Sequence, residues 1–281
     1  SHSALQSLES KPMTRQTIFI TGAASGIGRA TALQFHARGW FVGAADVDQA
    51  GLDVLKGDLD NDCFTAFLDV TDKAAFDQVM IDFGTAAGQR LDILFNNAGI
   101  AVFGFLDEVP FEKTLATVNV NLIGVLNGIH ASIHLLKQTP NALCFTTSSS
   151  AANFGSPGMA TYSATKVAVK GLTEAMSVEL ARFGARAADV SPGIIDTPLW
   201  QTGARFVRGE SRPVWNLPAL NHDREDAGRT LPADDVAECV WAAYIGEKLH
   251  WYVPPEVVER DKAKALNPEK LRDQLIAQQK K

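Results

Sequence analysis

Residues 17–28, with the sequence TIFITGAASGIG, decide the fold of this chain. A short apolar run at 17–20 is followed at once by the glycine-rich segment 21–28, and residues 29–39 have the composition of a helix. Glycines between a strand and a helix let the backbone approach a pyrophosphate, which the free N–H groups of a helix N-terminus attract. The segment therefore predicts a nucleotide-binding turn. Its G-x3-G-x-G spacing is not the commonest one, and a plain helix start is the alternative interpretation.

A second strand is predicted at residues 40–45, and it ends at Asp46. A carboxylate at this distance from the glycines accepts hydrogen bonds from both ribose hydroxyls of NAD, and it repels the 2′-phosphate of NADP. Asp46 therefore predicts NAD as the dinucleotide. The alternative is that Asp46 caps the helix predicted for residues 48–57.

The alternation of strand and helix continues along the chain. Each predicted strand is a continuous apolar run, which is typical of a parallel sheet whose two faces are both covered by helices. Further strands are predicted at residues 64–68, 91–95, 142–147, 186–190 and 249–253. Further helices are predicted at residues 72–87, 111–136 and 160–183, and from Pro232 onward. The sequence thus predicts an α/β fold built on a parallel sheet.

The helix predicted at residues 160–183 carries a tyrosine and a lysine on one face, because Tyr162 and Lys166 are four positions apart. A tyrosine has an unperturbed pKa of about 10, and a neighbouring ammonium lowers that pKa because it favours the phenolate. The pair can then donate and accept a proton near neutral pH. Ser149, thirteen residues before Tyr162, follows a predicted strand and can bind the same substrate oxygen. A Tyr-x3-Lys pair alone also arises by chance.

The composition excludes several classes of function. A hydrophobic content of 46% and a charged content of 21% are typical of a globular protein. The net charge of −6 offers no basic surface for nucleic acid or an anionic membrane, and no apolar run is long enough to span a bilayer. Cys63, Cys144 and Cys239 lack metal-ligand spacing and predict a reducing, cytoplasmic location. We expect no metal, no nucleic acid and no membrane as partners.

We expect a single domain over residues 13–281, with Met13 as the natural start and residues 1–12 as a tag remnant or disordered leader. Residues 197–231 are rich in Pro, Gly and Arg, and their length predicts a substrate loop that acts as a mobile lid. The charged extension at 254–281 is expected to form a peripheral helix.

These features closely resemble those of the short-chain dehydrogenase/reductase family. The likeness covers about residues 16–200 and rests on TGAASGIG, Asp46, the NNAG segment at 96–99, and Tyr162 with Lys166. It implies a three-layer, doubly wound parallel sheet, the Rossmann fold, and an oxidoreductase that interconverts a secondary alcohol and a ketone. It also implies a catalytic tetrad of Asn121, Ser149, Tyr162 and Lys166.

The resemblance assigns a role to each of the four. It implies that Tyr162 exchanges a proton with the substrate oxygen and that Lys166 stabilises the phenolate and binds the nicotinamide ribose. Ser149 is expected to donate to the substrate oxygen, and Asn121 to hold a water in a proton relay. The residues expected to bind the cofactor are Gly22, Ser25, Gly26, Ile27 and Gly28 at the pyrophosphate, Asp46, Asp69, Val70 and Asn97 at the adenosine half, and Tyr162, Lys166, Ile195 and Thr197 at the nicotinamide end.

Two departures from the family pattern bear on cofactor and assembly. Ser25 stands where many NADP-using relatives carry a basic residue, which favours NAD. The segment LHWYVPPE stands where many tetrameric relatives carry a Gly-Gly strand, so both a homodimer, through helices 111–136 and 160–183, and a homotetramer stay open.

The expected substrate is a small alcohol or ketone with a hydrophobic body. A carrier-bound 3-oxoacyl group is the runner-up, while a non-catalytic dinucleotide sensor and a non-redox enzyme of the same fold are the rival classes. The residues expected to line an apolar pocket are Phe103, Phe154, Trp200, Phe206, Val214 and Trp215.

Overall fold

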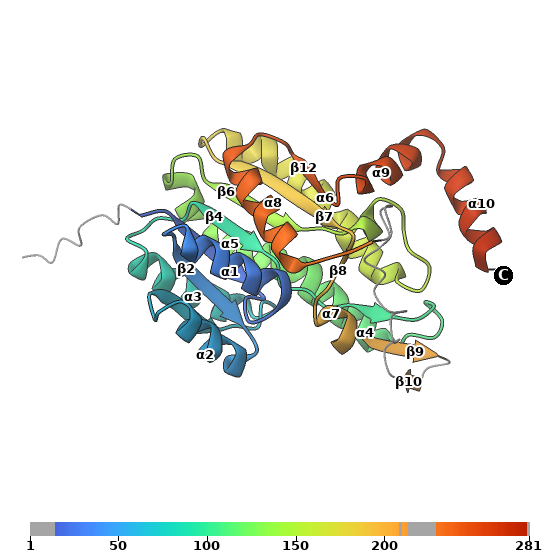
Figure 1. Cartoon of the computed structure of the whole chain (residues 1–281), viewed down its shortest axis with the longest axis horizontal. Coiled ribbons are helices and arrows are strands. Elements are labelled where there is room, and N and C mark those ends of the chain that lie inside the picture. The colour runs from blue at the N-terminus through green and yellow to red at the C-terminus, as the bar shows by residue number, and fades with distance from the viewer. Residues whose placement is uncertain (1–14, 208–209, 213–228, 280–281) are drawn as a thin grey trace, which may run out of the picture.

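A computed structural model of the chain describes residues 15–207, 210–212 and 229–279. Its centre is a sheet of seven strands, all paired in parallel, in the order β12-β7-β6-β4-β1-β2-β3 (Figure 1). The strands are β1 (Thr17–Thr21), β2 (Phe41–Asp46), β3 (Cys63–Phe67), β4 (Ile93–Asn96), β6 (Leu143–Thr147), β7 (Arg186–Pro192) and β12 (His250–Val253). The order reverses between β1 and β4, so their carboxyl ends border the crevice in which such folds bind ligands.

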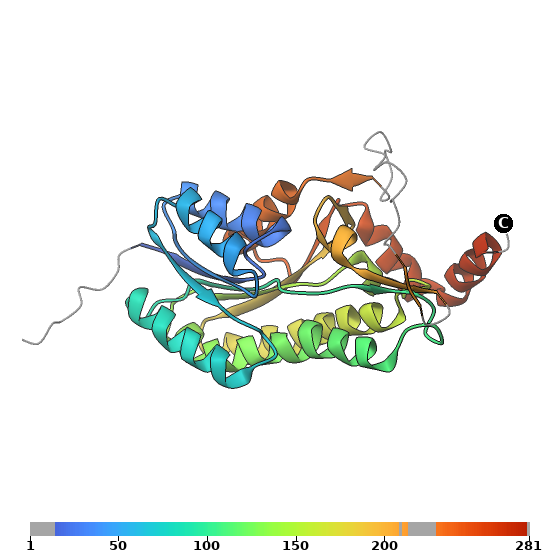
Figure 2. The same ribbon diagram turned by 90° about the horizontal axis from the view of Figure 1, so that it is seen from below.

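Helices cover both faces of this sheet, which confirms the predicted three-layer α/β fold (Figure 2). One face carries α1 (Gly26–Ala37), α2 (Gln49–Asp58) and α8 (Ala233–Ile245). The other carries α3 (Lys73–Ala86), α5 (Gly124–Gln138) and α6 (Ala160–Ala181). The helix predicted at 111–136 consists of α4 (Phe111–Val118), a π-helical turn η1 (Asn119–Ile123) and α5.

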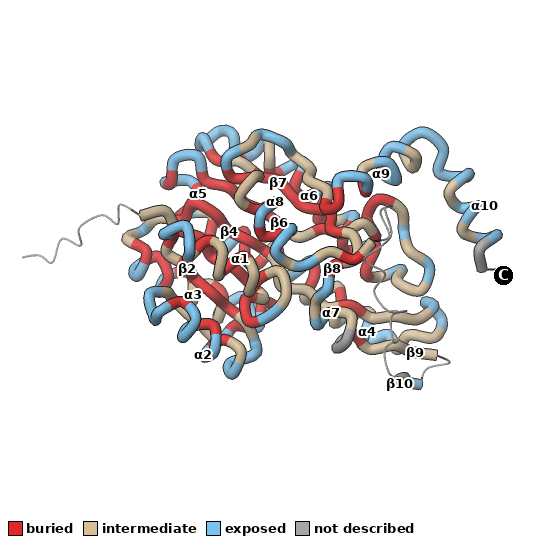
Figure 3. The backbone as a smooth tube through the Cα atoms, viewed as in Figure 1, coloured by how far each residue is buried: buried red, intermediate tan, exposed pale blue. Residues whose placement is uncertain are grey.

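The core forms two apolar layers, because successive side chains of a strand point to opposite faces. The buried residues gather at the centre of the molecule, along the strands of the main sheet (Figure 3). Ile18 and Ile20 of β1 pack with α1 and α8, where Trp40 and Tyr244 lie edge to face at 4.8 Å between ring centres. Phe19 packs into the opposite layer, 5.1 Å from the ring of Phe83 on α3. All five residues of β1 are buried, as the unbroken apolar run predicts.

Two small sheets pair parts of the segment 197–231 with the rest of the chain. They contain β5 (Val102–Phe103), β9 (Ala204–Val207) and β10 (Glu210–Arg212) in one, and β8 (Ile194–Ile195) and β11 (Thr230–Leu231) in the other. The short helix α7 (Leu199–Thr202) precedes β9. Residues 208–209 and 213–228, with Val214 and Trp215, lie outside the described residues, so the mobile lid stays a prediction.

The extension after β12 forms two helices, α9 (Val257–Leu266) and α10 (Pro268–Gln279). The sequence analysis places this tail at the periphery, and α10 does extend away from the body of the molecule (Figure 1). For α9 the expectation is wrong. Val257 is buried, and Asp261 pairs with Lys170 of α6, so α9 is packed against the helix that carries Tyr162. In the described part of the chain, no helix is long and apolar enough to cross a membrane.

Candidate active site

The glycine turn joins β1 to α1. Gly22 and Gly26 have φ angles of +67° and +51°, in the left-handed region that favours glycine. A Cβ atom on Gly28 would lie 2.1 Å from the carbonyl oxygen of Gly22, so α1 packs directly on the turn. Ser25 precedes α1 without a side-chain capping bond, which leaves the N–H groups of the first helical turn for an anion. The predicted nucleotide-binding turn therefore has the form of a phosphate cradle.

Gly28→Ala is expected to lower the free energy of unfolding by about 3 kcal/mol, because the new methyl meets backbone that cannot rotate away. The matched control is Gly57→Ala in α2, where a Cβ meets nothing within 4 Å, and which should raise that free energy by up to about 1 kcal/mol. Urea unfolding measures both. A Gly28→Ala protein as stable as the wild type would show that the turn is not closely packed.

Asp46 ends β2 and faces this turn. Its Oδ2 accepts from the backbone N–H of Ala24 at 2.9 Å, and its Oδ1 accepts from the N–H of Asp48 at 3.0 Å. The alternative role as a helix cap belongs to Asp48, whose Oδ1 accepts from the N–H of Gly51 in α2 at 3.0 Å. The Asp46 carboxylate is thus fixed beside the glycine turn, where a ribose would lie.

Asp69 and Val70 follow β3 at the same edge of the sheet. The Asp69 Oδ1 accepts from the N–H and the hydroxyl of Thr71, at 2.9 and 2.8 Å. Val70 packs against Gly124, on which a Cβ atom would lie 2.6 Å from the Val70 side chain. The carboxylate of Asp69 therefore stabilises the turn that follows β3.

Asn97 ties the glycine turn to β6. Its Nδ2 donates to the carbonyl oxygens of Thr21 and Gly22 at 3.1 and 3.3 Å, and its Oδ1 accepts from the Thr147 hydroxyl at 3.1 Å. The Thr21 hydroxyl oxygen accepts from the N–H groups of Asn97 and Ala98. Sequence reasoning named Asn97 and missed both threonines. The sequence could have identified both, since each threonine stands at the carboxyl end of an apolar strand.

Ser149, Tyr162 and Lys166 converge at the end of β6. Ser149 and Tyr162 line one cavity, and the Ser149 Oγ accepts from the N–H of Ala151 at 3.1 Å. Lys166 lies one turn beyond Tyr162 on α6, with its Nζ 5.5 Å from the centre of the tyrosine ring. The same Nζ donates to the carbonyl oxygen of Thr147 at 2.8 Å, which fixes the ammonium at the strand end.

Asn121 is buried in the π-helical turn η1, an irregularity that is frequent at functional sites. Its Oδ1 accepts from the N–H of Ile100 and its Nδ2 donates to the carbonyl of Ile100, both at 2.9 Å. A Cβ atom on Gly99 would touch both the Asn121 Oδ1, at 3.4 Å, and the Lys166 Nζ, at 3.6 Å. Asn121 thus borders Lys166, but its amide binds backbone, and the water relay stays a prediction.

Comparison with known proteins identifies the family. The short-chain dehydrogenase family matches residues 16–206, which include the glycine turn and the Tyr162–Lys166 pair. The chain is a short-chain dehydrogenase. Members of this family are oxidoreductases that use a nicotinamide dinucleotide, and the relatives of this chain support the interconversion of alcohols and ketones.

Individual relatives of this short-chain dehydrogenase act on different compounds. It is 37% identical over 183 residues to a 3-oxoacyl-[acyl-carrier-protein] reductase of Thermotoga maritima, which covers 64% of this chain and 74% of the relative. It is 32% identical over 246 residues to an L-2,3-butanediol dehydrogenase of Corynebacterium glutamicum, which covers 85% and 94%. A short-chain dehydrogenase/reductase of Burkholderia phymatum, solved in complex with NAD, aligns with a TM-score of 0.78, 26% identity and coverage of 93% and 96%.

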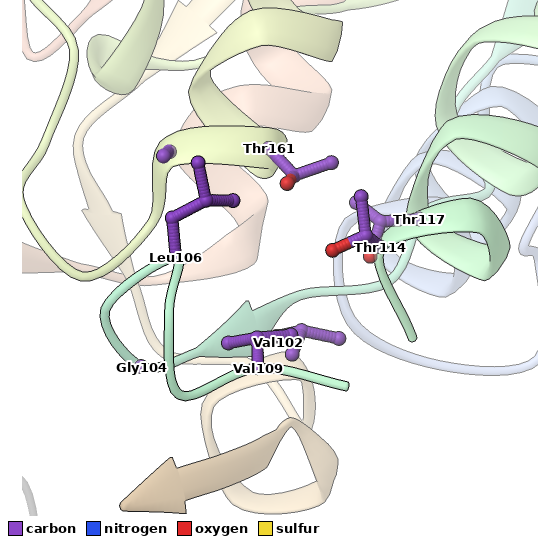
Figure 4. A pocket seen from close by; sticks show the side chains of 8 residues that line it. Val102, Gly104, Leu106, Val109, Thr114, Thr117 and Thr161 are labelled. Carbon is purple, nitrogen blue, oxygen red and sulfur yellow. The ribbon is translucent and has the colours of Figure 1, made fainter. Parts of the chain in front are cut away.

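The pocket of the short-chain dehydrogenase beside Tyr162 has a volume of about 420 Å³, within the range of small-molecule sites. Ser149 and Tyr162 line it together with Ile27 from α1 and with Ile195 and Thr197. It therefore joins the glycine turn to Ser149 and Tyr162 in one cavity. A smaller cavity lies between α4 and the start of α6, where Thr114, Thr117 and Thr161 surround a space of about 10 Å³ (Figure 4). Its size suits a single water and not a substrate.

Apolar side chains line this pocket and its continuation, as the sequence predicts for Phe103, Trp200 and Phe206. Trp200 lines it and is fixed by a hydrogen bond from its Nε1 to the carbonyl of Ile195 at 2.9 Å. Trp200 and Met159 also line a second cavity of about 300 Å³, whose wall includes Phe103 and Phe206. Among the described lining residues of both cavities Phe154 is missing, so its expected place in the pocket is wrong.

Burial sets the acidities of the two central groups in this short-chain dehydrogenase. Burial raises the pKa of Tyr162, and the side chain of Ser149 opposes this only in part, so the expected lowering of its pKa is not seen. Burial also lowers the pKa of Lys166 to about 8, because removing its charge from water is costly and no carboxylate of the described residues compensates that cost. Sequence spacing places the pair correctly but gives no measure of its desolvation.

Sequence reasoning missed one further residue of the pocket. Arg260 of α9 lines it, although it lies almost one hundred positions after Tyr162 and in a tail that was expected to be peripheral. No local pattern distinguishes Arg260 from the other charged residues of that tail. Only the packing of α9 brings it to the site.

Proposed function

We propose that this short-chain dehydrogenase uses NAD to interconvert a secondary alcohol and a ketone with a hydrophobic body. The observation that carries the proposal is the single pocket bordered by the Ser149–Tyr162 pair and by Ile27 and Thr197 at the glycine turn. A substrate carbon and a nicotinamide ring have to meet in such a cavity. Its apolar continuation past Trp200 supports a substrate with a hydrophobic body.

The proposed cofactor contacts follow the edge of the sheet. Backbone N–H groups at the start of α1 would bind the pyrophosphate, and Asp46 the adenosine ribose. When bound, the dinucleotide supplies hydride transfer. The residues proposed to hold it are Gly22, Ser25, Gly26, Ile27, Gly28, Asp46, Asp69, Val70, Asn97, Tyr162, Lys166, Ile195 and Thr197.

The protein's own side chains transfer the proton to or from the substrate oxygen. Tyr162 would give its hydroxyl proton to the carbonyl oxygen of a ketone, or take the proton of an alcohol in the reverse direction. Ser149 would donate a hydrogen bond to the same oxygen, where negative charge develops. Lys166, held by Thr147, would favour the phenolate of Tyr162 after proton release. We also propose that Asn121, which borders Lys166, links this lysine to solvent through water.

NAD preference over NADP is expected, because Asp46 would repel a 2′-phosphate and Ser25 offers it no positive charge. A repulsion of about 1–3 kcal/mol corresponds to a roughly 5- to 150-fold higher kcat/KM for NAD. Asp46→Ser should narrow this ratio, and Asp48→Ser, the same change at the neighbouring helix cap, should leave it unchanged. Equal kcat/KM values for the two dinucleotides in the wild type would contradict the assignment.

Absorbance of the reduced cofactor tests the reaction, with a panel of secondary alcohols in one direction and of ketones in the other. We expect turnover of compounds with an apolar chain or ring. The likeness to the Thermotoga maritima reductase favours a 3-oxoacyl thioester as the second candidate, so an acetoacetyl thioester belongs in the panel. If no compound changes the absorbance although NADH binds, a sensor role replaces the proposed reaction.

A homodimer also stays a proposal. The helices on which it would form expose large apolar side chains, namely Phe111, Leu115, Val167 and Val178.

A further inference from the structure

One side of the substrate pocket comes from the C-terminal extension. Arg260 of α9 lines the cavity that contains Ser149 and Tyr162. Among the described residues that line this cavity, Arg260 is the only charged one, and the others are apolar, hydroxyl-bearing or glycine. Arg260 is exposed at the edge of this cavity, where its guanidinium is within reach of a molecule that enters the pocket.

The backbone of α9 is fixed against the segment that follows Ser149. The Nδ2 of the fully buried Asn153 donates to the carbonyl of Val257 at 3.0 Å, and the Nζ of Lys264 donates to the carbonyl of Ala152 at 3.2 Å. Arg260 and Lys264 are four residues apart and therefore share a face of α9. That face is the one turned toward the site.

A second set of contacts ties α9 to the catalytic helix. Asp261 accepts from the hydroxyl of Tyr252 at 2.7 Å and pairs with the ammonium of Lys170. Lys170 lies one turn beyond Lys166 on α6. The position of Arg260 is thus set by the same helix that positions Tyr162 and Lys166.

The acidic residues around Arg260 bind other cations. Glu256 pairs with Arg229 at 3.2 Å, Glu259 pairs with Lys262 at 2.8 Å, and Asp261 pairs with Lys170. Within the described ranges, Arg260 itself makes no hydrogen bond and no ion pair. Its five N–H donors therefore have no described protein partner.

We propose that Arg260 binds a carboxylate of the substrate, so that the enzyme acts on a hydroxy acid and the matching oxo acid. The inference rests on the proposed function and adds the substrate class to it. The planar guanidinium matches a carboxylate with two parallel hydrogen bonds. The carboxylate and the reacting carbon would lie in the same cavity of about 420 Å³, which Arg260, Ser149 and Tyr162 all line. The carboxylate stays unchanged in the reaction.

Paired substrates test the proposal in the NAD-loaded enzyme. The wild type should oxidise 3-hydroxyhexanoate with a higher kcat/KM than its methyl ester. In Arg260→Gln the acid-to-ester ratio of kcat/KM is expected to fall about 10- to 100-fold, mainly through the KM of the acid. Arg260→Lys should give a ratio between those two. A purely structural role would lower both values together and leave the ratio constant, so a fall of less than tenfold overturns the proposal.

The matched control is Lys262→Gln, a change of the same charge two positions away on α9. Lys262 is exposed and pairs with Glu259, and it is not among the residues lining the pocket, so the acid-to-ester ratio should not change. An equal fall in this control would show a general effect of charge and would overturn the specific role of Arg260.

Calorimetry with compounds that cannot react separates this proposal from the reaction itself. The NADH-loaded wild type should bind hexanoate more tightly than hexanamide, and Arg260→Gln should lose about 10- to 100-fold of that preference. If neither hydroxy compound is oxidised but this preference is found, the proposed reaction fails and the carboxylate site stands. Equal binding of hexanoate and hexanamide by the wild type overturns the carboxylate site whether or not the enzyme turns over.

Discussion

Tyr162→Phe is expected to reduce kcat by about 10²- to 10⁴-fold, the usual contribution of a general acid or base. The ring is retained and continues to fill its buried position, so NADH binding should be nearly intact. The variant loses only the hydroxyl of a residue that lines the pocket together with Ser149. Turnover with the best compound of the alcohol panel measures kcat, and fluorescence titration measures the affinity for NADH.

Tyr244→Phe is the control for this prediction. Its hydroxyl donates to Asp92 and accepts from Gln16, in the core layer on the α8 side of the sheet and away from the pocket. Removal of that hydroxyl should change stability and leave kcat almost unchanged. A Tyr162→Phe enzyme that keeps more than a tenth of the wild-type kcat would disprove the role of Tyr162.

Lys166→Met is expected to have two opposite effects. Turnover should fall about 10²- to 10⁴-fold, because the phenolate of Tyr162 loses its neighbouring cation, and NADH should bind more weakly. The free energy of unfolding at pH 7 should rise. Burial lowers the pKa of Lys166 from 10.5 to about 8, and this difference corresponds to a cost of about 3 kcal/mol for the charged form. Loss of the bond to Thr147 offsets part of this, which leaves a net gain of about 1–2 kcal/mol.

The pH dependence of stability tests whether Lys166→Met raises the free energy of unfolding for the reason given. The folded-state pKa of Lys166 is below its unfolded value, so the unfolded chain binds more protons between about pH 8 and 10.5. Wild-type stability should therefore rise relative to that of Lys166→Met across this window, and the advantage of the variant should disappear above it. Urea unfolding of both proteins at several pH values measures the difference. A variant less stable than the wild type at pH 7 would refute the argument.

The parts of the fold that were predictable from the sequence rest on local patterns. The unbroken apolar run of β1 predicts a strand buried on both faces, and the spacing of Tyr162 and Lys166 predicts one helical face. The rejection of Asp46 as the cap of α2 needed the direction of the chain after β2, which gives the cap to Asp48. Such directions depend on tertiary structure, which spacing does not encode.

The properties that were not predictable depend on contacts between distant parts of the chain. The pKa of Tyr162 is raised because several elements bury this residue. The effect of burial is larger than the opposite effect of Ser149. The place of Arg260 depends on the ion pair between Lys170 and Asp261, which are 91 positions apart. The sequence of this charged tail gives no sign that it packs beside the helix that carries Tyr162.

Because α9 is attached after the last strand, the residues that line the pocket come from two separate parts of the chain. One part forms the sheet and the glycine turn, and the other adds a wall of the pocket. The seven strands of the main sheet, the glycine turn and Tyr162 all lie before residue 254, whereas Arg260 lies after the last strand. Insertions, deletions or recombination beyond that strand can exchange one side of the pocket without altering any strand pairing. If Asp261 and Lys264 are kept, the helix stays attached at the same place while its other residues can change. Sequence changes in α9 would then alter this wall of the pocket while the sheet and the glycine turn stay the same.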